Sequence, residues 1–167
     1  MIFRKAIISG PHAIRQSAIP PHPSILFSCS DPSGVGQASA GPARILIVED
    51  DFLVASDMEM ALTEAGMEIA GVASSAEKAL ELAEAERPAL AVMDIRLAGK
   101  RDGIDAALDL FGTLGIRCVF ATAHHDTATR ARAEAAHPLA WVSKPYTMAT
   151  LIEAVRDALK EAQGKQG

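Results

Sequence analysis

Short apolar runs alternate with amphipathic segments of helical length from residue 44 to residue 162. The apolar runs cover 44–49, 68–73, 89–93, 116–121 and 139–143. The segments between and after them cover about 52–65, the stretch from Ser74 or Ser75 to Pro88, 104–114, 126–136 and 148–162, with apolar residues at helical spacing. Five strand–helix units of this regularity predict an α/β domain with a parallel sheet, helices on both faces and right-handed connections.

Composition and charge exclude several classes of function. Residues 44–167 carry thirteen basic and twenty acidic side chains, a net charge of −7, which argues against binding nucleic acid through its phosphates. No segment has the roughly 18 consecutive apolar residues of a membrane-spanning helix. Cys29 and Cys118 support no disulfide framework. We expect a cytoplasmic protein that binds neither nucleic acid nor membranes.

The first 42 residues differ from the rest of the chain. They are rich in proline, serine and glycine and show no sustained periodicity. Prolines at 20, 21 and 23 interrupt what would have to be the apolar core of a signal peptide. We interpret residues 1–42 as a flexible extension or the product of a start assigned too far upstream, 43–163 as the domain, and 164–167 as a tail.

Polar residues follow four of the apolar runs. The first run ends in Glu49, Asp50 and Asp51, the third in Asp94, the fourth in Thr122 and the fifth in Lys144 and Pro145. The carboxyl ends of parallel strands line one crevice, where ligands bind. Acids gathered there repel one another unless a cation joins them, and oxygen ligands suit Mg²⁺. Either Asp50 or Asp51 has the alternative role of capping the first helix.

Lys144 is followed by a proline, which restricts its backbone to an extended conformation. An ammonium held at the sheet edge would neutralise a carboxylate or bind a phosphoryl oxygen. Taken alone, Thr122 would be interpreted as a helix-capping hydroxyl. Together with the acids and Lys144, it becomes a donor to the same phosphoryl group.

These residues resemble the receiver domain of two-component response regulators. The resemblance rests on the segments IVEDD (47–51), MDIRL (93–97), DG (102–103), FATA (120–123) and KP (144–145), and it covers about 44–162. It implies a flavodoxin-like, doubly wound five-stranded parallel sheet of order 2-1-3-4-5 with five helices. It also implies a stand-alone signalling domain and not an enzyme, apart from catalysing its own phosphorylation and dephosphorylation.

By this resemblance, Asp94 looks like the phosphoacceptor. Glu49, Asp50 and Asp94 would hold Mg²⁺ with the backbone carbonyl of Arg96, and Lys144 and Thr122 would complete the catalytic set. The phosphoryl donor would be a sensor histidine kinase or a histidine phosphotransfer protein.

The resemblance also implies a switch. Thr122 would be its hydroxyl and Trp141 its aromatic residue, while Arg96 and His124 lie where the family tunes phosphoryl lifetime. Phosphorylation would then act on the face made by 126–136, 139–143 and 148–162, which would contact a downstream protein or form a homodimer. The domain would either control that partner or shuttle phosphate.

The sequence departs from the family pattern in the loop 95–103, which lacks the usual proline and is one residue longer, and in the large switch residue Trp141. One alternative is a pseudo-receiver that binds partners without phosphorylation. A second is an aspartyl-phosphate phosphatase, which generally needs an acid where Arg96 stands. A third is a flavodoxin-like cofactor binder, which would need phosphate-binding loops in place of the acids.

Overall fold

The computed structural model describes residues 42–123 and 126–164. The predicted extension over 1–42, except for its last residue, lies outside the described residues, as do His124 and positions 165–167 of the predicted tail. Within the described ranges, no helix is both long and apolar enough to cross a membrane.

The chain forms a five-stranded parallel sheet in the predicted order, β2-β1-β3-β4-β5. The strands are β1 (Arg44–Val48), β2 (Glu68–Ala73), β3 (Leu90–Met93), β4 (Arg117–Thr122) and β5 (Ala140–Ser143). The helices are α1 (Phe52–Glu64), α2 (Ala76–Glu86), α3 (Gly103–Leu114), α4 (Thr127–Ala133) and α5 (Met148–Gly164), with a 3₁₀ turn, η1 (Glu134–Ala136). The flavodoxin-like fold is therefore confirmed.

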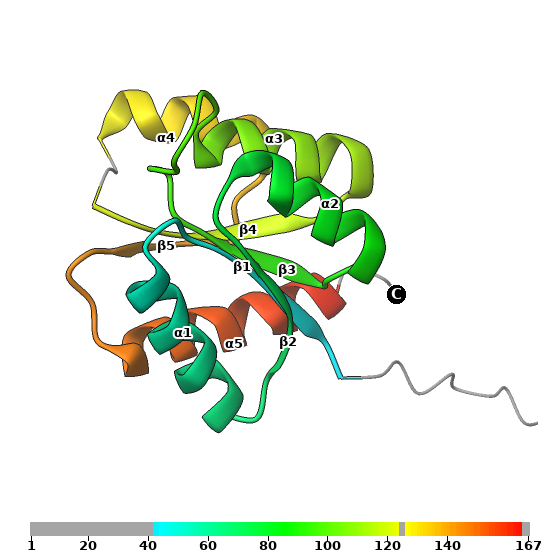
Figure 1. Cartoon of the computed structure of the whole chain (residues 1–167), viewed down its shortest axis with the longest axis vertical. Coiled ribbons are helices and arrows are strands. Elements are labelled where there is room, and N and C mark those ends of the chain that lie inside the picture. The colour runs from blue at the N-terminus through cyan, green and yellow to red at the C-terminus, as the bar shows by residue number, and fades with distance from the viewer. Residues whose placement is uncertain (1–41, 124–125, 165–167) are drawn as a thin grey trace, which may run out of the picture. The chain divides into compact units, whose positions relative to one another are not determined.

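Helices cover both faces of the sheet (Figure 1). On one face, α1 and α5 pack through Met58, Leu62 and Leu151 against Ile45 and other inward strand residues. On the other face, the small residues of α2 and α3 pack around the remaining strand side chains. Both cores are needed because β3 and the centre of the sheet are apolar on both faces.

Some boundaries differ from the predicted ones. The segment 126–136 divides into α4 and the 3₁₀ turn η1, and α5 continues to Gly164. β4 includes Thr122 instead of ending before it, because Thr122 pairs with Ser143 of β5. The second helix ends at Glu86, before Pro88, with Arg87 in a left-handed conformation.

The helix caps decide between alternatives that the sequence leaves open. Asp51 caps α1, since its carboxylate accepts hydrogen bonds from the backbone of Leu53 and Val54. Ser75 caps α2. The Asp51 carboxylate is therefore engaged in capping α1. Glu49 and Asp50 remain as the candidate ligands at the end of the first strand.

Gly103 joins the third strand end tightly to α3. Its N–H donates to the carbonyl of Ile95 at 2.8 Å. A Cβ at this position would lie 2.0 Å from the backbone oxygen of Asp94. Only glycine permits this approach, so the backbone of Asp94 and the first turn of α3 are in direct contact.

We predict that Gly103→Ala lowers the free energy of unfolding by about 1–3 kcal/mol, because backbone must move to admit the methyl group. Gly112, also on α3, is the matched control because an added Cβ meets nothing within 4 Å. Gly112→Ala should raise the free energy of unfolding by roughly 0.5–1 kcal/mol. Urea denaturation of the two variants and the wild type measures both effects. Equal stability of the two variants would contradict the close approach.

Candidate functional site

The predicted site residues occupy the carboxyl ends of adjacent strands. Backbone hydrogen bonds across the sheet fix these ends: Asp94 N–H donates to the carbonyl of Val48 at 2.9 Å, and Lys144 N–H donates to the carbonyl of Thr122 at 3.0 Å. Glu49 N–H donates to Ala73 at 3.0 Å. Strands β1 and β3 are also where the direction of winding changes, which is where doubly wound sheets bind ligands.

Lys144 bridges the two buried acids of the site. Its Nζ lies 2.8 Å from Oε2 of Glu49 and 2.7 Å from Oδ2 of Asp94. Glu49 is 3% exposed and Asp94 is 9% exposed. The peptide bond between Lys144 and Pro145 is cis. One ammonium group therefore compensates two carboxylates that would otherwise repel each other.

The surroundings shift the pKa values of this group. Burial raises the pKa of Glu49, the hydrogen bond from Lys144 opposes this shift, and the charge of Asp94 adds to it. Burial disfavours the charged form of Lys144, but its hydrogen bonds to Asp94 and Glu49 outweigh burial and raise its pKa. Lys144 therefore stays charged at neutral pH, and Glu49 holds a proton more readily than an ordinary glutamate.

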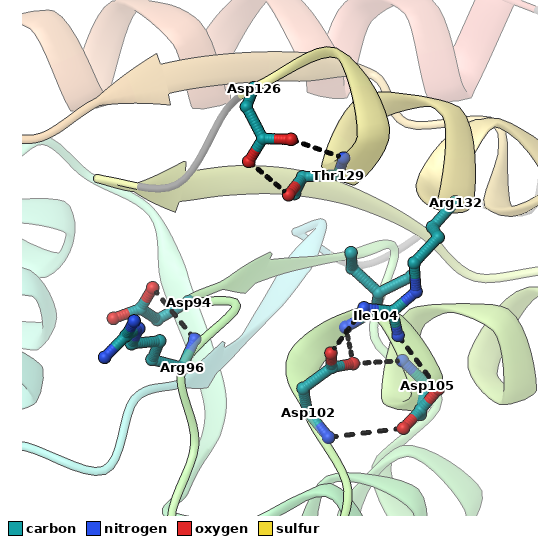
Figure 2. Close-up of polar contacts among 8 residues, drawn as sticks. All are labelled: Asp94, Arg96, Asp102, Ile104, Asp105, Asp126, Thr129 and Arg132. Atoms are coloured by element: carbon teal, nitrogen blue, oxygen red, sulfur yellow. Dashed lines mark hydrogen bonds and ion pairs between the residues drawn. The ribbon is translucent and has the colours of Figure 1, made fainter.

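Asp50 and Arg96 lie at the open side of the site. Asp50 is exposed and follows Glu49 directly. The backbone N–H of Arg96 donates to Oδ1 of Asp94 at 3.4 Å, and the Arg96 side chain is exposed (Figure 2). Beside Glu49 and Asp50 a cleft of 570 Å³ opens along the apolar side chains of Phe52, Ala55 and Val72. Ligands therefore have access to the acids from solvent.

The donor set suits Mg²⁺ in chemistry but forms no preassembled cage. Among the described residues, no three His, Cys, Asp or Glu side chains are arranged to hold a metal ion together. Mg²⁺ needs only one or two carboxylates and keeps several waters. Glu49 and Asp94 supply buried carboxylates, and the exposed Asp50 follows Glu49 directly in the chain. The residues therefore fit a water-rich magnesium site open to solvent.

The proposed switch residues lie in neighbouring strands. Thr122 is buried at the end of β4. The Trp141 ring on β5 stacks on Phe120 of β4, with ring centroids 4.7 Å apart. The guanidinium of Arg130 on α4 lies 4.8 Å from the centre of the same ring. Trp141 thus packs against both the sheet and α4. His124, the other proposed modulating residue, lies outside the described residues.

Sequence reasoning missed two features near the site. Arg132 of α4 pairs with Asp102 and Asp105 at the start of α3. Tyr146, two residues after Lys144, has a buried hydroxyl without a hydrogen-bond partner. The sequence of α4 does not indicate which helix its charged residues face. In the sequence, Tyr146 looks like an ordinary core residue. The partners of Arg132 lie about 30 residues away in the sequence, and the burial of the Tyr146 hydroxyl depends on packing, so only the tertiary structure reveals these features.

The fold, the acids and the bridging lysine define a receiver domain, and comparison with known proteins agrees. Residues 45–156 match the family model of the response regulator receiver domain. The transcriptional regulatory protein PdtaR of Mycobacterium tuberculosis is 37% identical over 72% of this chain and 58% of its own length. The phyllosphere-induced regulator PhyR of Methylorubrum extorquens is 32% identical over 77% of this chain and 48% of its own length.

Solved structures show the same architecture. A CheY-like response regulator receiver domain protein from Methanospirillum hungatei matches with a TM-score of 0.69 and 26% identity, over 75% of this chain and 99% of that one. This 167-residue chain belongs to the response regulator receiver family. Phosphorylation and Mg²⁺ are typical of that family. The chain spans about half the length of the curated relatives described above.

We predict that Glu49→Gln changes how stability depends on pH. The folded protein holds the Glu49 proton more tightly than the unfolded chain, so the wild type loses free energy of unfolding as the pH rises above the ordinary glutamate value of 4.5. The variant lacks this titration and should gain stability relative to the wild type as the pH rises from 4.5 toward neutrality. Urea denaturation across that range, without divalent cations, measures the difference.

The matched control is Glu59→Gln, which removes an exposed carboxylate from α1. Its stability relative to the wild type should change little over the same range. A Glu49→Gln curve that runs parallel to the wild-type curve would contradict the raised pKa of Glu49.

Proposed function

We propose that Asp94 accepts a phosphoryl group from the phosphohistidine of a sensor histidine kinase or of a histidine phosphotransfer protein. An oxygen of the Asp94 carboxylate attacks phosphorus, the bond from phosphorus to the imidazole nitrogen breaks, and the electron pair stays on the imidazole. Such a transfer needs positioning and charge neutralisation more than covalent machinery. The observation that carries the proposal is the Lys144 ammonium, 2.7 Å from Asp94 at the edge of the sheet.

Each residue of the site has a role in this proposal. Mg²⁺, held by Glu49, Asp50, Asp94 and the Arg96 carbonyl, would neutralise charge on the transferring phosphoryl oxygens. Lys144 already lies beside the attacking carboxylate and would donate to a phosphoryl oxygen after transfer. The same site would catalyse the later hydrolysis of the aspartyl phosphate, with Arg96 and His124 as the residues that tune its rate.

The surface around the acids suits a protein donor. Phe52 and Leu53, at the start of α1, are 79% and 72% exposed. Contiguous exposed apolar surface marks interaction sites, and these two adjacent side chains would form part of such a surface. They lie next to Asp50, so a partner that docks on α1 would bring its histidine to the site.

The output of the domain would be the face made by α4, β5 and α5. Phosphorylated Asp94 offers new acceptor oxygens, and Thr122 at the end of β4 would move to donate to them. Trp141, stacked on Phe120 and next to Arg130, would respond to that movement. A downstream protein or a second copy of the chain would bind the altered face.

Two alternatives receive less support. A pseudo-receiver has no need for the complete set of acids, threonine and lysine at the strand ends. An aspartyl-phosphate phosphatase generally needs a second acid where this chain has Arg96, whose side chain is exposed.

We predict that the protein gains one labile phosphoryl group when incubated with Mg²⁺ and acetyl phosphate, and that Asp94→Asn abolishes the gain. Intact-mass spectrometry measures it. Asp57→Asn, which alters an exposed carboxylate on α1, is the matched control and should be phosphorylated like the wild type. Phosphorylation that survives Asp94→Asn would contradict the assignment of Asp94 as the phosphoacceptor. No gain of mass in the wild type would favour the pseudo-receiver.

We also predict that Thr122→Ala separates phosphorylation from switching. In the wild type, phosphorylation should change the fluorescence of Trp141, the only tryptophan of the chain. The variant should still accept the phosphoryl group, but this fluorescence change should be lost or strongly reduced. Thr113→Ala removes an exposed hydroxyl from α3 and should leave the fluorescence response intact. An unchanged response in Thr122→Ala would remove Thr122 from the switch.

A further inference from the structure

An ion-pair cluster joins α4 to the start of α3. Arg132 of α4 lies 2.9 Å from Oδ2 of Asp102 and 3.4 Å from Oδ1 of Asp105. Figure 2 shows the Arg132 side chain extending from α4 toward both carboxylates. These three side chains, here called the Arg132 clamp, connect positions about 30 residues apart in the sequence.

The α3 side of the clamp is rigidly attached to the backbone of Asp94. Oδ1 of Asp102 accepts hydrogen bonds from the backbone of Ile104 and Asp105 at 3.0 Å each, and the Asp105 side chain accepts from the backbone of Asp102 at 3.3 Å. This capping box fixes the turn just before Gly103, which contacts the carbonyl of Asp94. The carboxylates of the clamp are therefore held in place without Arg132.

The α4 side of the clamp is much less constrained. Helix α4 has seven residues, and its only buried residue is the small Ala133. Its remaining side chains are exposed or half-buried. A short helix with so little buried apolar surface gains little from packing. The Arg132 clamp is thus a major connection between this helix and the part of the domain that carries Asp94.

We propose that the Arg132 clamp holds α4 in the arrangement in which Lys144 contacts the Asp94 carboxylate, and that it opposes the rearrangement that the proposed function assigns to phosphorylation of Asp94. The inference rests on the proposed function, since it assigns to the clamp the control of the switching equilibrium. Anything that stabilises the resting arrangement alone lowers the apparent affinity for a phosphoryl group.

The charges of the clamp are stable around neutral pH. Hydrogen bonding to Asp102 and its charge raise the pKa of Arg132. Burial would raise the pKa of Asp102, but the hydrogen bond from Arg132 and those from the backbone outweigh burial and lower it. Arg101 does not compete for Asp102, because its guanidinium contacts the Asp109 carboxylate and the backbone of Asp105. The Arg132 side chain is 53% exposed, so salt screens the ion pairs of the clamp.

The test compares Arg132→Gln with Lys160→Gln. Both variants lose one cation, but the ion pair of Lys160 lies within α5, with Asp157. Beryllofluoride with Mg²⁺ stands in for the phosphoryl group, and calorimetry measures its affinity. We expect Arg132→Gln to bind beryllofluoride more tightly than the wild type, by up to about fivefold, the range for an exposed ion pair. Lys160→Gln should bind like the wild type.

Two further measurements identify the clamp itself. Hydrogen exchange of residues 127–136 should be faster in Arg132→Gln before beryllofluoride is added. Asp102→Asn keeps a good helix cap while removing the charge, so it should tighten binding as Arg132→Gln does. Because Arg132→Gln already removes both ion pairs of the clamp, the double variant should gain no more than Arg132→Gln alone.

Equal affinities of Arg132→Gln and Lys160→Gln, or weaker binding by Arg132→Gln, would overturn the clamp as a brake and leave the proposed function standing. Independent, additive effects of Arg132→Gln and Asp102→Asn would also overturn it. A wild type that binds no beryllofluoride would instead overturn the proposed function, and the coupling with it.

Discussion

The balance of charge around Lys144 is the interaction on which the functional end of this domain depends. Glu49 and Asp94 are buried acids on neighbouring strands, and parallel pairing of β1 with β3 leaves them no way to move apart. Placing two carboxylates so close is unfavourable without a cation. Lys144, delivered by the end of β5, contacts both. In the proposed function, Lys144 and Mg²⁺ together neutralise the negative charge of the two carboxylates and of the phosphoryl group.

The connection from β3 to α3 gives the site a second rigid boundary. The loop after Asp94 departs from the usual family pattern in length and lacks a proline, yet its far end is closely anchored. Gly103 packs against the Asp94 carbonyl, and Asp102 and Asp105 cap α3 reciprocally. Arg101 is anchored to Asp109 of α3. A structural change at Asp94 would therefore meet the anchored start of α3 on one side and the lightly packed α4 on the other.

Most of the fold and the core of the site were predictable because their signals are local or periodic. The strand–helix alternation predicts the units, and the chemistry of the strand ends predicts which side chains meet. The role of Asp51 was open because a cap and a metal ligand have the same sequence signature; hydrogen bonds to Leu53 and Val54 decide it. The break between α4 and η1 was missed because alanine-rich sequence favours α-helix throughout 126–136. Tertiary packing overrides that preference.

The sequence by itself determined the order of the strands and helices, their polar ends and the family to which the chain belongs. Those features depend on the order and spacing of residues, which the sequence states directly. Only the tertiary structure decided that one ammonium contacts both buried acids, that the Trp141 ring contacts both Phe120 and Arg130, and that Arg132 joins α4 to the first turn of α3. These contacts join residues far apart in the chain, and their geometry depends on how strands align and helices pack, which no local pattern encodes.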